Sequence, residues 1–169
     1  IEATGDAFPF KTTLTERDSG DTTTDIATQS ATELVSAGAD VVIQNWLDDH
    51  SRYLLYCTAF RSVSVTDVVT SFTTVIDTNG LPASTLTDNG SVYTSRFIHG
   101  HNDFERLIAT LGIKQKNGSP GHPQTQGKIE RFHQTLKRWL AARPRPATLT
   151  DLQCLLDEFA IIYNTARTH

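Results

Sequence analysis

Apolar and polar positions follow a strand-like pattern in the second quarter of the chain. The apolar pair at 34–35 and the apolar run at 41–47 flank a turn-like stretch at 36–40, which predicts a hairpin leading into a mostly buried strand. The aromatic and apolar run at 53–60 predicts a third strand after a turn at 48–51. This region is therefore expected to form three antiparallel strands.

Farther along the chain, apolar residues recur at spacings of three and four, which is typical of helices. They predict a helix over 65–78 that ends at Asn79-Gly80, a short helix over 104–111, and a last helix over 149–163. The clearest helix has one apolar stripe and stops before Pro144. That stripe consists of Ile129, Phe132, Leu136 and Leu140.

Short strands are expected over 82–88 and 113–116, and a flexible loop over 117–123. Three strands, a helix and then further strand and helix units predict an α/β fold with a mixed sheet. Residues 12–32 contain ten Ser/Thr and only four apolar side chains, a composition that buries little surface. We therefore expect a weakly structured N-terminal segment over 1–33 and one folded domain over 34–169.

Charge is distributed unevenly along the 169 residues, whose net charge is only −4. Residues 1–50 carry two basic and ten acidic side chains, whereas residues 106–145 carry nine basic side chains and one acid, Glu130. A stretch of forty residues with a net charge of +8 is the kind of footprint that binds phosphate backbones. The acidic total therefore does not exclude a nucleic-acid partner.

The sequence gives no support for a disulfide scaffold, a zinc site or a membrane partner. Cys57 and Cys154 lie far apart without ligand spacing, so neither a disulfide scaffold nor a zinc site is indicated, and a reducing cytoplasmic setting is expected. The longest apolar run, 159–163, is far shorter than the roughly 20 residues of a membrane span. No membrane partner is expected.

Two acidic residues are candidates for chemistry. Glu130 shares one face of its predicted helix with His133 and Lys137, and it either pairs with neighbouring bases or ligates a metal ion. Asp88 ends a predicted strand in an Asp-Asn-Gly turn, a common structural signature that also falls where α/β sheets gather ligands. Neither acid is decisive by itself.

Together with their surroundings, these acids resemble a known pattern. The order of motifs over about 34–169 is similar to the integrase catalytic core of retroviral integrases and of DDE transposases from bacterial insertion sequences. The motifs are Asn45-Trp46-Leu47-Asp48-Asp49-His50-Ser51-Arg52-Tyr53, Leu86-Thr87-Asp88-Asn89-Gly90, Tyr93-Thr94-Ser95, the stretch 122–137 around Lys128-Ile129-Glu130-Arg131, and Tyr163-Asn164 with Arg167 and His169.

The resemblance implies a ribonuclease H-like fold, with a mixed five-stranded sheet flanked by helices, and transfer of DNA strands with two Mg²⁺ or Mn²⁺ ions. Asp88 and Glu130 would be catalytic metal ligands, because hard cations prefer oxygen. Phosphate contacts would come from Lys128, Arg131, His133, Lys137 and Arg138. The implied partners are the ends of a DNA element, target DNA and further copies of the chain, in a nucleoid-associated homodimer or larger assembly.

The family also needs a carboxylate on its first strand, usually in a Trp-x-x-Asp-x-Thr context that this chain lacks. The segment that comes nearest to this motif is Thr24-Asp25-Ile26-Ala27-Thr28, which contains Asp25. A hairpin that turns about Gly38 would set residue 25 opposite residue 51, and Gln29 opposite residue 47, where the family's acid belongs. Asp25 would then lie four residues, about 13 Å, from the expected position.

Three accounts of the missing acid remain open. A longer hairpin would bring Asp25 into the site as the third catalytic and metal-binding residue; the strand has no first acid; or Asp48 or Asp49 partly substitutes. The leading hypothesis is a metal-dependent integrase or transposase core. The alternatives are an inactive remnant that binds DNA or self-associates, and a nuclease of the same fold that hydrolyses DNA without joining it.

Overall fold

The computed structural model describes residues 26–32, 41–87, 90–95, 100–117 and 123–166. Along the chain these form β1 (Ile26–Thr32), β2 (Val42–Asp48), β3 (Leu54–Phe60), α1 (Val65–Asn79), β4 (Ser84–Thr87), α2 (Asp103–Thr110), β5 (Lys114–Asn117), α3 (Pro123–Ala141) and α4 (Leu149–Ala166). Asp25 and Asp88 lie outside the described residues.

The five strands form one mixed sheet in the order β3-β2-β1-β4-β5. β1 and β3 both run antiparallel to β2, whereas β1 pairs in parallel with β4, and β4 with β5. This confirms the expected mixed, five-stranded α/β architecture. β1 lies at the centre of the sheet, where it joins the antiparallel half to the parallel half.

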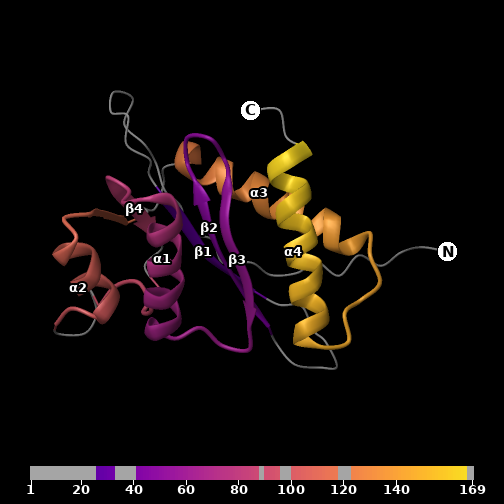
Figure 1. Ribbon diagram of the computed structural model, residues 1–169, viewed down its shortest axis with the longest axis horizontal. Helices are drawn as coiled ribbons and strands as arrows, with labels where there is room; N and C mark the ends of the chain where they lie inside the picture. The colour runs from indigo at the N-terminus through magenta and orange to yellow at the C-terminus, as the bar shows by residue number, and fades with distance from the viewer. Residues whose placement is uncertain (1–25, 33–40, 88–89, 96–99, 118–122, 167–169) are drawn as a thin grey trace.

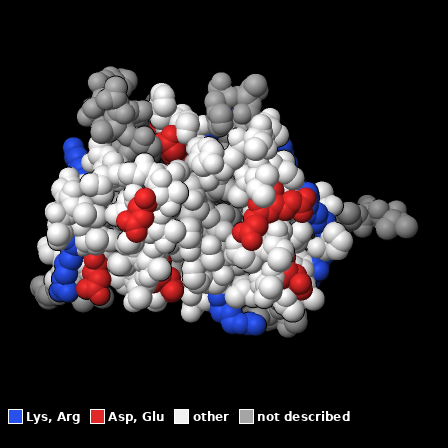
Figure 2. All heavy atoms as spheres, in the orientation of Figure 1, with Lys and Arg blue, Asp and Glu red and all other residues white. Residues whose placement is uncertain are grey.

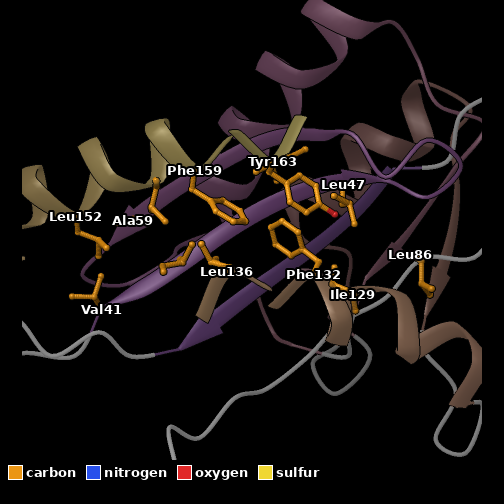
Figure 3. Close-up of a cluster of buried hydrophobic side chains, with 13 residues drawn as sticks. Val41, Leu47, Ala59, Leu86, Ile129, Phe132, Leu136, Leu152, Phe159 and Tyr163 are labelled. Atoms are coloured by element: carbon orange, nitrogen blue, oxygen red, sulfur yellow. The ribbon is translucent and has the colours of Figure 1, made fainter. Parts of the chain in front are cut away.

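Helices cover both faces of this sheet, as Figure 1 shows. α1 and α2 enclose one hydrophobic cluster around Trp46, Phe72 and Phe104. α3 and α4 pack on the other face, where Phe132, Phe159 and Tyr163 point toward one another (Figure 3) with their ring centroids 5.2–6.0 Å apart. The sheet thus holds the two helical layers at fixed positions.

The predicted helices are confirmed with small shifts at their ends. α1 begins after Ser64, whose side chain forms a capping box with Asp67, and it stops at Gly80, where φ is +87°. In α3 the predicted stripe is confirmed, because Ile129, Phe132 and Leu136 are buried in the cluster under α3 and α4 and Leu140 packs against it. α3 begins at Pro123, the last residue of the loop expected over 117–123.

Two expectations about the N-terminal half differ from the structure. Residues 26–32 fall in the segment expected to be weakly structured, yet they form the central strand, because β2 and β4 supply hydrogen-bond partners on both sides. The hairpin register also differs by two residues. Ile26 pairs with Asp48 and Ala27 with Leu47, whereas the sequence placed Gln29 opposite residue 47.

Among the described residues, no helix is both long enough and apolar enough to cross a membrane.

Candidate metal and nucleic-acid site

Glu130 lies on α3 with its side chain exposed, one residue after the fully buried Ile129. Ile129 anchors this turn in the same hydrophobic cluster as Leu86 of β4 (Figure 3). Within the described part of the chain, Glu130 has no hydrogen bond or ion pair with any of the neighbouring bases. Glu130 therefore forms no surface salt bridge with these bases, and its carboxylate is available to bind a cation.

Lys128, two residues before Glu130, is held by a buried acid. Its Nζ lies 3.1 and 3.2 Å from the carboxylate oxygens of Asp49, whose side chain is 3% exposed and also accepts a 2.7 Å hydrogen bond from Arg52. This contact joins the end of β2 to the N-terminal part of α3. Lys128 therefore orients the turn that carries Glu130, and part of its charge is neutralised.

His133 does not share the exposed face of Glu130, so that expectation is wrong. Its side chain is buried and its Nε2 lies 3.3 Å from Oδ1 of Asn45 on β2. Burial lowers the pKa of His133 to about 3, and the positive charge of Lys137 acts in the same direction. At neutral pH His133 is an uncharged link between α3 and the sheet.

The other candidate phosphate ligands remain accessible. Arg131 and Arg138 are exposed and Lys137 is half-buried, with its pKa below the ordinary value because of that burial. Acidic side chains occupy the middle of the face shown in Figure 2, over α1 and α4, and basic ones appear at its margins. α3 passes behind α4 in this orientation (Figure 1), so its bases are not gathered on the acidic face.

The chain on either side of Asp88 and Asn89 is tightly held. Before them, Thr87 is buried, and its Oγ1 accepts a 3.4 Å hydrogen bond from Nε2 of Gln115. After them, the turn 90–95 is tied to Glu105 by Thr94 and Ser95. Sequence reasoning missed Gln115 and Glu105, although Asn102-x-x-Glu105 has the spacing of a capping box, which would have indicated the latter.

The central strand provides no carboxylate between Ile26 and Thr32, since its sequence is IATQSAT. β1 pairs with β4 through Ala27 and Leu86, so two further steps along both strands lead to Gln29 and to position 88. Asp25 is four residues from position 29, about 13 Å of extended chain. The observed hairpin register gives a shorter separation, because Ala27 lies opposite Leu47 and Asp25 is only two residues from Ala27 in the sequence.

Asp49 and one carboxylate oxygen of Asp48 are occupied by other contacts. Both are buried; Asp48 accepts hydrogen bonds from the backbone N–H and the hydroxyl of Ser51, and Asp49 holds Arg52 and Lys128. The account in which Asp49 replaces the first-strand acid therefore loses support, whereas Asp48 keeps a buried Oδ1 that has no hydrogen-bond partner among the described residues. Among the described residues, no group of three His, Cys, Asp or Glu side chains is placed to hold a metal ion.

Several solved structures share the fold at low sequence identity. The HTLV-2 integrase catalytic core domain in complex with magnesium, in a trimeric form, matches with a TM-score of 0.65 and 15% identity, covering 86% of this chain and 87% of that one. The BIV integrase catalytic core domain matches with a TM-score of 0.63 and 21% identity over 86% of each chain. The ribonuclease H-like fold is thereby confirmed.

Curated relatives include both viral and bacterial proteins. The Gag-Pro-Pol polyprotein of Simian retrovirus SRV-1 is 36% identical over 91 residues, which is 54% of this chain and 5% of the polyprotein. Transposase InsD for insertion element IS2D of Escherichia coli (strain K12) is 33% identical over 104 residues, 59% of this chain and 33% of that protein. The chain thus spans a third or less of these two relatives.

Two family models described as "Integrase core domain" match residues 14–123 and 111–169. Between them they cover almost the whole chain, including Asp88 and Glu130. The chain belongs to the integrase core domain family.

Proposed function

We propose that this chain is the catalytic core of a metal-dependent polynucleotidyl transferase, which hydrolyses a phosphodiester at the ends of a DNA element and joins the resulting 3′-hydroxyl to target DNA. The observation that carries the proposal is the exposed carboxylate of Glu130, which has no partner among the described residues although it stands within a basic segment. Membership of the integrase core family supports the reaction class.

Asp88 and Glu130 are the residues that would hold divalent cations, since carboxylate oxygens suit Mg²⁺ and Mn²⁺. Such ions, when bound, activate the attacking hydroxyl group and stabilise the leaving oxygen of an in-line displacement. The HTLV-2 integrase core that shares this fold is a complex with magnesium, which supports the choice of metal. Lys128 and Ile129 fix the turn of α3 on which Glu130 stands, one through Asp49 and the other through the core.

DNA is the proposed partner, held by Arg131, Lys137 and Arg138. Lys128 contributes less than these, because Asp49 already neutralises part of its charge, and buried His133 acts through α3 rather than on phosphate. Neighbours described as an intasome and as dimeric and trimeric integrase cores support a homodimer or a larger assembly. Two copies would hold two element ends together.

The test uses a labelled duplex with a recessed 3′ end and the Glu130→Gln variant. We expect the wild-type chain to give products longer than the substrate with Mg²⁺ or Mn²⁺, and Glu130→Gln to give neither cleavage nor joining while it binds DNA as well or better. Glu158→Gln on α4 is the matched control, because it removes an acid that pairs with Arg143. Shortened products alone would indicate a simple nuclease, and retained cleavage by Glu130→Gln would overturn its assignment.

Asp25 is tested by Mn²⁺ titration of the wild-type chain and of Asp25→Asn, with Asp21→Asn as the control for a nearby acid. If Asp25 completes the site, its variant alone loses affinity. Equal affinities would mean that Asp88 and Glu130 bind the metal without an acid from the first strand. A wild-type chain that binds DNA but no metal would point to the inactive remnant.

A further inference from the structure

Strand β5 carries two lysines on the same face of the sheet as α3. Ile113, just before the strand, is buried in the cluster enclosed by α1 and α2, and the Gln115 amide donates to the carbonyl oxygen of Tyr93 in that cluster at 2.9 Å. Side chains along a strand alternate between its two faces. Lys114 and Lys116 therefore lie on the opposite face, which α3 and α4 cover.

The strand register places these lysines near the N-terminal half of α3. Lys116 is the cross-strand partner of Leu86 on β4, about 4.8 Å away, and Lys114 lies two residues, about 6.6 Å, from Lys116 along β5. Leu86 is buried in the same cluster as Ile129 of α3. Lys116 is thus one strand away from the contact between β4 and the turn of α3 that carries Glu130.

The helices on this face stop short of β5. Among the described residues, their hydrophobic cluster contains side chains from β2, β3 and β4 but none from β5. β5 is also an edge strand of the described sheet. Lys114 is accordingly exposed and Lys116 is half-buried. The edge offers two positive charges on the face of the sheet where Arg131 and Arg138 of α3 are also exposed.

Lysines on edge strands have a simpler explanation, since they also prevent the edge from pairing with another chain. A strand of four residues needs little such protection, because short edge strands are already poor templates for pairing. Protection would also be served by lysines on either face, whereas both lie on the face of α3. Their surroundings favour an anion, since Glu130 is the only acid between residues 106 and 145.

We propose that Lys114 and Lys116 bind the phosphate backbone of the DNA that α3 contacts, so that one duplex lies across the edge strand β5 and the exposed bases of α3. This surface rests on the DNA partner of the proposed function, and it adds a contact from the sheet to those from the helix. Two lysines about 6.6 Å apart match two steps of about 3.4 Å along one DNA strand. Contacts to phosphate strengthen binding without selecting a sequence.

The experiment measures the salt dependence of DNA binding by the complete chain, using fluorescence anisotropy with a labelled 3′-recessed duplex at about 50–200 mM salt. Lys114→Gln and Lys116→Gln each remove one charge, and Lys114→Arg retains it. Arg61→Gln is the matched control, because this exposed base follows β3 at the opposite edge of the sheet. Sedimentation velocity of the same proteins measures self-association.

We expect Lys114→Gln to lower the slope of log K against log salt concentration by about 0.9, the contribution of one phosphate contact. Lys116→Gln should lower it by no more than this amount, because Lys116 is half-buried. Lys114→Arg and Arg61→Gln should leave the slope unchanged, and all variants should sediment like the wild-type chain. A loss at Arg61→Gln equal to that at Lys114→Gln would overturn the proposal, since any exposed base would then contribute.

The strand-transfer assay separates two sources of the bound phosphates. The recessed duplex serves as the element end and a plasmid as the target, and KM is measured for each. For Lys114→Gln, a higher KM for the duplex assigns the lysine to the element end, and a higher KM for the plasmid assigns it to target DNA. If neither KM rose, the proposal would be overturned, because the lysine would bind DNA only outside the reacting complex.

Failure of this surface is distinguishable from failure of the proposed function. A slope that falls in Arg131→Ala but not in Lys114→Gln would overturn the β5 contact alone. Self-association of Lys114→Gln with an unchanged slope would do the same, because the lysine would then only protect the edge. A wild-type chain that shows the expected slopes but joins no strands would overturn the proposed reaction and support the β5 contact. A wild-type chain that binds no DNA would overturn both.

Discussion

A single residue, His133, shows how burial decides protonation in this chain. Its folded pKa of about 3 lies below the ordinary value of 6.5, so the unfolded chain takes up the proton first as the pH falls. The stability that depends on neutral His133 is complete above pH 6.5 and is lost progressively from there toward pH 3. Each pH unit in this window costs at most about 1.4 kcal/mol from this residue.

We therefore predict that His133→Gln flattens the pH dependence of stability between pH 6.5 and 4. Glutamine cannot take up a proton in this range and can still reach Asn45. Urea unfolding at several pH values gives the difference between the two chains, in which the shared contribution of carboxylates cancels. Parallel curves for wild type and variant would contradict the burial of an uncharged histidine.

At the scale of elements, α4 protects the open edge of the sheet. β3 is an edge strand, and side-chain amides of α4 bind its outward backbone groups: Asn164 bonds both N–H and C=O of Leu54 at 2.8 and 2.9 Å. Gln153 bonds the N–H of Ala59 at 3.0 Å and the C=O of Cys57 at 3.1 Å. Such cover removes the donors and acceptors that would otherwise pair with another chain.

Each of these amides serves as the control for the other. Asn164→Ala should lower the free energy of unfolding by about 1–3 kcal/mol and speed amide exchange at Leu54 but not at Ala59. Gln153→Ala should speed exchange at Ala59 but not at Leu54. If both variants accelerated exchange at both amides, the cover of β3 would be one cooperative unit rather than two separate bonds.

The same scale shows how far the sequence predicts this fold. Helix 65–78 and the stripe from Ile129 to Leu140 were predictable because each buries a regular apolar face. The sequence of β1, IATQSAT, has no such face, and its strand depends on partners remote in the chain, which periodicity cannot reveal. The exposure of Glu130 was predictable from the buried apolar stripe beside it, whereas its role as a metal ligand stays a prediction. The sequence wrongly placed His133 on the exposed face, because it stands next to Phe132 at the border between the exposed and buried faces of α3.

At the scale of the whole molecule, the opposite charges of the two halves are partly paired with one another. Asp49 from the acidic half holds Lys128 from the basic half, so the +8 of residues 106–145 is not all available to DNA. Arg143 is also engaged, since it pairs with Glu158 and stacks on Trp139. The exposed bases of α3, Arg131 and Arg138, have no partner among the described residues. The positive charge that DNA can reach is therefore smaller than the net charge counted from the sequence.

The difference between paired and unpaired basic side chains predicts how DNA binding depends on salt concentration. Each phosphate contact contributes about 0.9 to the slope of log K against log salt concentration. Arg131→Ala and Arg138→Ala should each reduce the slope by close to that amount, whereas Lys128→Ala should reduce it by clearly less because Asp49 already holds the ammonium group. Arg106→Ala, which removes an exposed base paired with Asp103 on α2, should leave the slope unchanged. Fluorescence anisotropy with a short duplex at 50–200 mM salt measures all four slopes, and a loss at Lys128 as large as that at Arg131 would show that DNA displaces Asp49 from Lys128.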